Sequence, residues 1–318
     1  MEEKQINKWL RRRFTAVGWT LIVYYIIMNI LTVLAMALDA ARQMLGAFAS
    51  GRYGAGVDMD AIAGNAWGYI LTIAVGLVIL HAWKGWDYWK TEILAKERNM
   101  PPAVFFSLLS LFMGAQMVNS LWIGLLEWIL NQFGLSVVAT LESVSGASDT
   151  FSMFLYSALL APVAEEILFR GYVLRTLRPF GKRFAIFGSA FLFGLFHGNL
   201  LQTPYAFLVG LLLGYVAVEY SVLWAMALHM FNNLVLADLL SRLTERLPEM
   251  VGTSLNLLLF GGFALASLVI LITKRNQIRA YRQSEWMDRR CLKCFFSCSG
   301  VIVLTVIMVI NMALLLFL

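Results

Sequence analysis

The sequence has little charge, little proline and little cysteine for its length. Only 14% of its 318 residues are charged, whereas 60% are apolar. An average soluble protein is roughly 45–50% apolar and about 25% charged, so a soluble fold of this size would lack the polar residues needed to cover its surface. The three cysteines, Cys291, Cys294 and Cys298, lie within eight residues of one another and give no disulfide framework. The composition excludes a soluble enzyme and predicts a polytopic membrane protein.

Long apolar stretches account for most of the chain. A transmembrane helix needs about 20 mainly apolar residues, and the sequence predicts eight or nine such spans, of which 184–199 and 204–220 are the shortest. The fold class that we expect is therefore all-α, a polytopic bundle of transmembrane helices. The expected spans are 16–38, 65–83, 104–130, 151–171, 184–199, 204–220, 222–240, 253–273 and 295–318. With six prolines, no Pro-rich linker and no alignable repeat, these spans indicate one membrane domain and not an inverted-repeat transporter.

Lysines and arginines predict the orientation, because they are enriched in cytoplasmic loops. If the N-terminus is cytoplasmic and there are nine spans, 21 of the 25 basic residues fall on the cytoplasmic side. The net charge of +6 then follows from topology and from contact with the lipid bilayer, and it does not indicate a nucleic-acid partner. Short loops and the absence of sorting sequences favour a bacterial plasma membrane.

Polar side chains inside the apolar spans are concentrated between residues 160 and 233. An ionisable group within a bilayer costs about 2.5 to 3.5 kcal/mol on insertion scales, so each one needs a reason. They occur as three short motifs on three successive predicted helices. These motifs are Glu165-Glu166-x-x-x-Arg170, Phe193-x-x-x-His197 and His229-x-x-Asn232-Asn233.

Helix geometry separates the expected roles of these side chains. Glu166 and Arg170 are four residues apart and share a helix face, so we expect them to form an ion pair. Glu165 lies about 100° around the helix and lacks that partner, which suits a general base. On another helix His229 and Asn233, or His229 and Asn232, could project into one cavity, and the spacing does not decide between the two asparagines.

These residue types suit the activation of water and the stabilisation of an oxyanion. Glu165, helped by His197, would deprotonate a water that attacks a peptide carbonyl, while His229 and Asn233 would donate hydrogen bonds to the tetrahedral intermediate. Glu165, His197 and His229 could instead bind zinc or another divalent metal, since catalytic zinc sites often use three such ligands. The sequence leaves the metal-free and the metal-dependent mechanism open.

The three motifs, in this order on apolar helices, resemble those of the CPBP family. These are the CAAX-protease and bacteriocin-processing membrane proteins, also called the Abi family or type II CAAX prenyl endopeptidases. The resemblance covers Ser152 to Leu240 and includes the string Glu-Glu-Ile-Leu-Phe-Arg-Gly at 165–171. It implies a catalytic core at 151–240. Hydropathy and charge divide the rest of the chain into three N-terminal spans (1–150) and two C-terminal spans joined by a basic cytoplasmic loop (241–318).

The family resemblance also implies a function, an intramembrane endopeptidase that acts on a membrane-associated peptide or protein, such as a prenylated CAAX end or a peptide precursor. It assigns Glu165 and His197 to water activation and His229 and Asn233 to the oxyanion site. Glu166, Arg170, Phe193 and Asn232 would support them. We expect the active site to open toward the cytoplasmic half of the membrane. The alternatives are a non-catalytic immunity or scaffold protein that binds a membrane peptide, and a small transporter.

Overall fold

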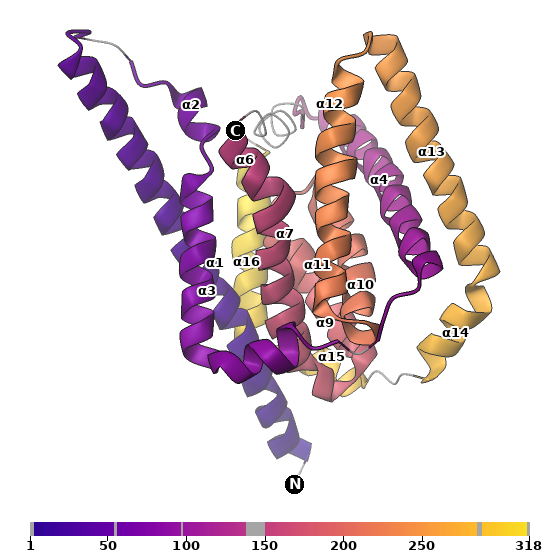
Figure 1. Cartoon of the computed structure of the whole chain (residues 1–318). Helices are drawn as coiled ribbons and strands as arrows, with labels where there is room; N and C mark the ends of the chain where they lie inside the picture. The colour runs from indigo at the N-terminus through magenta and orange to yellow at the C-terminus, as the bar shows by residue number, and fades with distance from the viewer. Residues whose placement is uncertain (1–2, 54–55, 97, 138–149, 285–287, 317–318) are drawn as a thin grey trace.

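The computed structural model describes the chain except residues 1–2, 54–55, 97, 138–149, 285–287 and 317–318. The regular structure of the described residues is entirely helical (Figure 1). The first half contains α1 (Glu3–Ala49), α2 (Met59–Ala63), α3 (Trp67–Tyr88), η1 (Trp89–Ile93) and α4 (Pro102–Asn131). A continuous helical stretch follows, made of α6 (Phe151–Leu155), η3 (Tyr156–Leu160), α7 (Ala161–Glu166), η4 (Ile167–Leu174), α8 (Arg175–Leu177) and η5 (Arg178–Phe180). The remaining helices are α9 (Lys182–Phe196), α10 (Thr203–Glu219), α11 (Val222–Phe231), η6 (Asn232–Leu239), α12 (Leu240–Glu245), α13 (Glu249–Thr273), α14 (Arg275–Ser284), α15 (Arg289–Phe296) and α16 (Ser299–Leu314).

All nine apolar segments predicted from the sequence form helices, but they do not all have the length of a membrane span. Among the described residues, five helical segments are long and apolar enough to cross a membrane, and the pair α15–α16, bent by 58°, gives a sixth if it counts as one span. Residues 317–318 of the expected last span lie outside the described part. The segments predicted at 184–199, 204–220 and 222–240 correspond to α9, α10 and α11–η6. At 1.5 Å per residue, the 17 residues of α10 reach about 26 Å, less than the roughly 30 Å of a hydrocarbon core.

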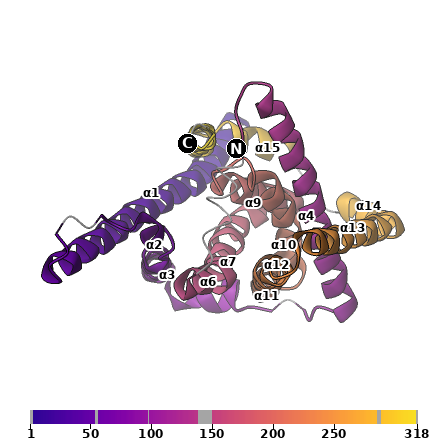
Figure 2. The ribbon, with the colours of Figure 1, turned by 90° about the horizontal axis from the view of Figure 1, so that it is seen from above.

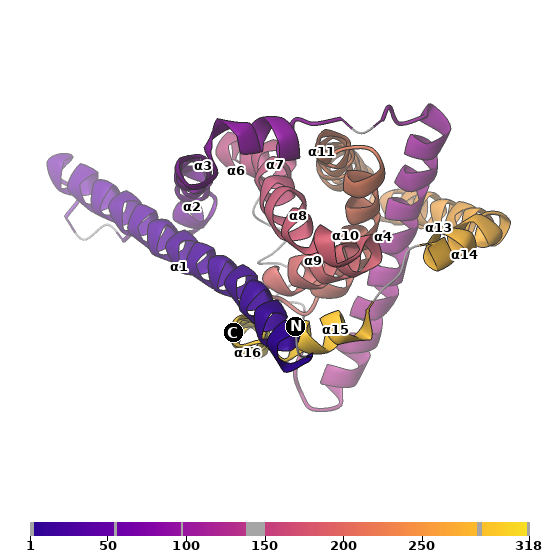
Figure 3. The ribbon, with the colours of Figure 1, turned by 90° about the horizontal axis from the view of Figure 1, so that it is seen from below.

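The shorter helices stand at the centre of the bundle and the long ones surround them. Figure 2 shows α9, α10 and α11 between two outer groups, α1 with α2 and α3 on one side, and α4 with α13 and α14 on the other. Seen from below, α15 lies beside the N-terminal part of α1, next to α9 (Figure 3). The two ends of the chain lie at opposite ends of the bundle (Figure 1). Because the central helices are covered on several sides, polar groups on them can be removed from both lipid and water.

The helices that carry the first and the third polar motif contain π-helical turns. Residues of η3, η4 and η6 follow the wider π pattern, and they lie immediately before or after α7 and α11. Pro162 stands in the first turn of α7 and has no backbone N–H to donate, and the π turn η3 ends two residues before it. π turns are frequent at functional sites. Here they alter which side chains share a face of the helix.

The first and last helices cross at a point where both backbones carry glycine. A Cβ atom added to Gly18 of α1 would lie 2.2 Å from the backbone carbon of Gly300 in α16, and one added to Gly300 would lie 2.2 Å from the carbonyl oxygen of Thr15. Only glycine permits this approach. Nearby, Cys291, Cys294 and Cys298 are free thiols, all buried. This packing holds α1 against the core.

The central helices α9 and α10 pack closely through small residues. A Cβ atom on Gly210 would lie 3.1 Å from Ala190 of α9, and one on Gly214 would lie 3.2 Å from the side chain of Ile186. This contact positions the carbonyl of Gly210 and the ring of Phe193 beside the polar motif of η4. The packing of two short helices thus builds one wall of the candidate site.

Candidate functional site

The ion pair predicted between Glu166 and Arg170 is present and completely buried. Arg170 Nη1 lies 3.0 Å from Glu166 Oε1, and both side chains have no exposed surface. The guanidinium also donates from Nη2 to the carbonyl of Gly210 at 3.3 Å, and its Cζ lies 4.2 Å from the centre of the Phe193 ring. Arg170 therefore joins η4 to both α9 and α10. A buried charge needs such compensation, because an isolated one would be strongly destabilising.

His229 connects this ion pair to Glu165, the other glutamate of the motif. Its Nδ1 lies 2.9 Å from Glu166 Oε1, and its Nε2 lies 3.8 Å from Glu165 Oε2. The carboxylate of Glu166 thus fixes the orientation of the imidazole, in the way that a carboxylate orients histidine in many hydrolytic sites. With Nδ1 committed to Glu166, Nε2 is the nitrogen that remains for chemistry, and it points toward Glu165.

Glu165 lines a cavity, whereas Glu166 and Arg170 do not. One third (33%) of its side chain is exposed, and it lines a partly open cavity of about 230 Å³. Phe193 and His197 line the same cavity. The structure thereby brings together the glutamate of the first motif and the histidine of the second. The helix argument that separated Glu165 from Glu166 agrees with this arrangement, since one glutamate faces the cavity and the other faces the core.

His197 is held in place by the end of its own helix. α9 ends at Phe196, and Gly198 adopts φ +64°, a left-handed conformation that glycine tolerates best. The His197 Nδ1 lies 2.8 Å from the carbonyl of Phe193, and its ring packs edge-on against the Phe193 ring at 4.8 Å between centroids. If the Nδ1–H donates to that carbonyl, Nε2 is left as the acceptor.

The two asparagines of the third motif form a chain of hydrogen bonds. Asn232 Nδ2 donates to Asn233 Oδ1 at 3.0 Å, and Asn233 Nδ2 donates to the carbonyl of Ser157 at 3.0 Å. The hydroxyl of Tyr205 donates to Asn232 Oδ1 at 3.1 Å. The π turn η6 begins at Asn232, so both asparagines belong to it, while His229 belongs to the preceding α11. Neither asparagine is among the residues that line the cavity with Glu165.

A metal site of three protein ligands was one interpretation of the sequence. Within the described residues, no group of three or more His, Cys, Asp or Glu side chains converges closely enough to bind a metal ion. Glu165 and His229 approach each other to 3.8 Å, while His197 has its Nδ1 on a backbone carbonyl. In this arrangement the donor set of Glu165, His197 and His229 does not fit a preformed three-ligand site, and we derive no step through a metal.

Several residues of the site have no place in the three sequence motifs. Tyr24 of α1, Tyr156 of η3 and Gln202 line the cavity beside Glu165, and Tyr205 of α10 anchors Asn232. Tyrosine is common at membrane interfaces, so its presence in an apolar span carries no specific indication of a site. Pro204, which follows Thr203 at the start of α10, gives the only local hint that a helix begins near Tyr205.

Comparison with known proteins agrees with the motifs. A family model described as type II CAAX prenyl endopeptidase Rce1-like matches residues 147–235. This confirms the similarity inferred from the sequence, and all three polar motifs lie inside the matched region. No curated protein and no solved structure matches the chain. The family similarity indicates a membrane protease of the CAAX type.

Proposed function

We propose that this protein is an intramembrane endopeptidase that hydrolyses a peptide bond in a membrane-associated substrate of the prenylated CAAX type. The observation that carries the proposal is the position of His229, held by the buried Glu166 with its other nitrogen directed at Glu165. Glu165 in turn faces a cavity shared with His197. A base, a histidine and an oriented imidazole beside one cavity are the groups that water-dependent peptide hydrolysis needs.

In the proposed reaction Glu165 removes a proton from a water molecule held in the cavity. His197 accepts a second hydrogen bond from that water through Nε2, so that the oxygen is aimed at the scissile carbonyl. The water oxygen attacks the carbonyl carbon and forms a tetrahedral oxyanion, while its proton is held by Glu165. Glu165 then donates this proton to the leaving amine as the C–N bond breaks. The products are a carboxylic acid and an amine, which exchange a proton to give a carboxylate and an ammonium, and the carboxylate of Glu165 is regenerated.

The oxyanion is assigned to His229 and Asn233. His229 can donate from Nε2 when it is an imidazolium, since Nδ1 faces Glu166. Glu165, Glu166 and Arg170 together carry one net negative charge, which an imidazolium would balance in these low-dielectric surroundings. Asn233 uses one N–H for the Ser157 carbonyl, and its amide has a second N–H to offer. Glu166 and Arg170 position His229 and do not meet the substrate.

For the membrane orientation we propose a cytoplasmic N-terminus and nine helical segments that enter the membrane, in a bacterial plasma membrane. The central helices α9 and α10 then lie within the bilayer without spanning its full thickness on their own. The position of the basic helices supports a cytoplasmic N-terminus. The basic helices α14 and α15 lie at the end where the chain begins (Figure 1), as expected when lysine and arginine face the cytoplasm.

The test is cleavage of an S-farnesylated CAAX peptide by the purified protein in nanodiscs. General acid–base catalysis contributes roughly 10²- to 10⁴-fold, so Glu165→Gln should lower the cleavage rate by at least about a hundredfold. Glu249→Gln, at the exposed start of α13, is the matched control and should cleave at the wild-type rate. Wild-type samples treated with a chelator test metal dependence separately. Equal rates in Glu165→Gln and wild type would refute the catalytic assignment, and binding without cleavage by the wild type would favour the scaffold alternative.

A further inference from the structure

The connection between α9 and α10, residues 197–202, is fixed by two neighbouring helices although it lies outside the regular helical structure. The carbonyl of Gly198 accepts a hydrogen bond from Asn311 Nδ2 of α16 at 2.9 Å. The carbonyl of Leu200 accepts one from Trp122 Nε1 of α4 at 2.9 Å. Backbone polar groups that are removed from water need such partners. The connection that follows α9 therefore has a defined conformation, and its side chains are held in place.

Within this connection, Asn199 determines how the side chain of Gln202 is oriented. The backbone N–H of Gln202 donates to Asn199 Oδ1 at 2.7 Å, so the other end of the Asn199 amide is its NH₂ group. Asn199 Nδ2 donates to Gln202 Oε1 at 2.8 Å and to the carbonyl of His197 at 3.3 Å. Because a side-chain amide has oxygen at one end and nitrogen at the other, Gln202 has its oxygen committed to Asn199 and its Nε2 directed away from it.

The Nε2 of Gln202 has no acceptor among the residues that the structure describes. Gln202 lines the same cavity as Glu165 and His197. Tyr24 and Tyr156 also line it, but a hydroxyl rotates and can either donate or accept, whereas Nε2 only donates and carries two N–H groups. The cavity of the proposed base thus contains an oriented donor that belongs to none of the three motifs.

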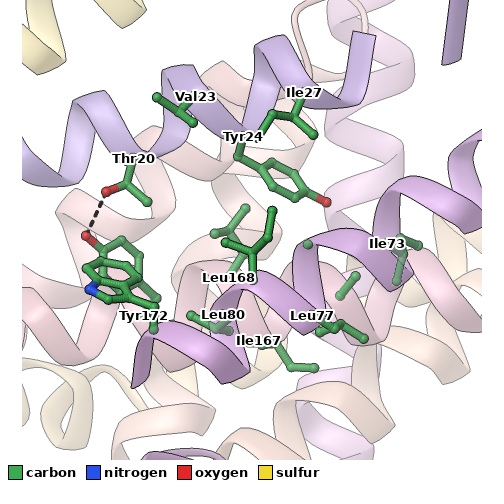
Figure 4. A pocket seen from close by; sticks show the side chains of 14 residues that line it. Thr20, Val23, Tyr24, Ile27, Ile73, Leu77, Leu80, Ile167, Leu168 and Tyr172 are labelled. Carbon is green, nitrogen blue, oxygen red and sulfur yellow. Dashed lines mark hydrogen bonds between the residues drawn. The ribbon is translucent and has the colours of Figure 1, made fainter. Parts of the chain in front are cut away.

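The walls beside this cavity are apolar, which strengthens a hydrogen bond made inside it. Four residues line both the cavity and an adjoining pocket, namely Tyr24, Ile73, Ala164 and Leu168. Figure 4 shows this pocket, in which aliphatic side chains of α1, α3 and η4 face one another. The hydroxyls of Thr20 and Tyr172 are hydrogen-bonded to each other there at 3.0 Å (Figure 4). A charge that develops beside such walls depends on oriented donors for its stabilisation.

We propose that Gln202 is a further catalytic residue, whose Nε2 donates a hydrogen bond to the oxygen of the scissile carbonyl as this oxygen becomes the tetrahedral oxyanion. This rests on the proposed function and adds a third donor to His229 and Asn233. Neither of those two residues lines the cavity with Glu165, whereas Gln202 does. Gln202 keeps its protons throughout, and the hydrogen bond strengthens as negative charge collects on the oxygen. Asn199 is a positioning residue that holds the amide in this orientation.

The first experiment compares kcat and KM for the S-farnesylated CAAX peptide in nanodiscs. Gln202→Met removes both N–H donors. Gln202→Glu also removes them but keeps an oxygen that accepts from Asn199 Nδ2, so the connection is preserved. Loss of one oxyanion donor lowers kcat by about 10²- to 10³-fold, so both variants should lose at least about a hundredfold in kcat, with KM within about threefold of wild type. Gln277→Met, on the exposed helix α14, is the matched control and should leave both constants unchanged.

Three kinetic results would overturn the inference. Wild-type kcat in Gln202→Met removes the residue from the reaction. A loss in Gln202→Met that Gln202→Glu does not share assigns the residue to the structure of the connection, through its oxygen. A higher KM with an unchanged kcat assigns the residue to binding of the intact substrate.

A second measurement does not depend on turnover. The probes are two forms of S-farnesylated acetyl-Cys-Val-Ile-Met in which the peptide bond after the cysteine cannot be cleaved. One carries a phosphinate there, which is tetrahedral and anionic, and the other a ketomethylene, which has a planar carbonyl. Gln202→Met should raise the Kd of the phosphinate by about a hundredfold and leave that of the ketomethylene nearly unchanged. Equal changes in the two Kd values, or no change in either, overturn the inference.

The outcomes separate this inference from the proposed function. If wild-type protein cleaves the peptide and prefers the phosphinate, but Gln202→Met retains the same preference, the endopeptidase stands and the inference does not. If the preference depends on Gln202 but no peptide is cleaved, the oxyanion site stands and the endopeptidase does not. A wild-type protein that binds both probes equally has no oxyanion site, which overturns the role of Gln202 as its donor.

Discussion

Replacing Arg170 by methionine should destabilise the protein far more than the loss of a surface charge. The guanidinium is completely buried between Glu166, the carbonyl of Gly210 and the ring of Phe193. Methionine keeps most of the volume of the side chain but removes its charge and its donors, so Glu166 becomes an uncompensated buried carboxylate. Breaking a buried ion pair in this way costs about 3–5 kcal/mol. This shifts the unfolding equilibrium by roughly a hundredfold to several thousandfold.

The measurement is the free energy of unfolding in mixed micelles, obtained by titration with a denaturing detergent. Arg12→Met, which removes an exposed arginine of α1, is the control and should change the value by less than about 1 kcal/mol. The double variant Glu166→Gln/Arg170→Met removes the orphaned charge as well as its partner. It should regain at least half of the lost stability, because neutral groups replace both charges.

Two results would refute this reasoning. If Arg170→Met is as stable as Arg12→Met, the ion pair does not hold η4 against α9 and α10 as the contacts indicate. If the double variant is no more stable than Arg170→Met alone, the loss comes from packing against Phe193 and not from the unpaired Glu166. In the second case Glu166→Gln alone should leave the free energy of unfolding almost unchanged. The same detergent titration measures it.

Three further outcomes follow from the site and from the packing around it. His197→Ala should lower cleavage by about a hundredfold or more with an unchanged unfolding midpoint; near-normal turnover would remove His197 from the reaction. Tyr205→Phe deletes the hydrogen bond to Asn232 and should reduce kcat about three- to tenfold at constant KM, which steady-state kinetics would detect; a change confined to KM would contradict a positioning role. Gly300→Val forces α16 away from Thr15 of α1 and should cost about 1–3 kcal/mol of stability, measured by detergent titration; a stability equal to wild type would show that the helices can separate freely.

The sequence predicts the helical class and the ion pair well, because both depend on local patterns. Glu166 and Arg170 are four residues apart, and that spacing places them together even though π turns begin right after Glu166. For the third motif the spacing leaves the choice between Asn232 and Asn233 open. There η6 begins at Asn232, and Asn233 donates to the carbonyl of Ser157, a contact between residues 76 positions apart that helix spacing does not predict.

Contacts between helices are the part that the sequence does not predict. The bond from His229 to Glu166 joins residues 63 positions apart, and helix periodicity contains no information about which faces of two helices meet. The number of helices that cross the whole membrane stays a prediction for a related reason. Hydropathy identifies α10 as apolar, but an apolar helix inside a bundle and one that faces lipid have the same composition, and only length and neighbours distinguish them.

The contact between α1 and α16 has a consequence for how the protein is made. Gly18 is translated and inserted early, whereas Gly300 follows all the helices of the core, so the crossing at these two glycines forms only after the intervening chain has entered the membrane. Until then the face of α1 that α16 covers is open to lipid or to a chaperone. Assembly therefore ends with a closing step, in which α16 packs against α1. A chain that stalls before α16 would contain all three polar motifs yet lack the contact that holds α1 in place beside them.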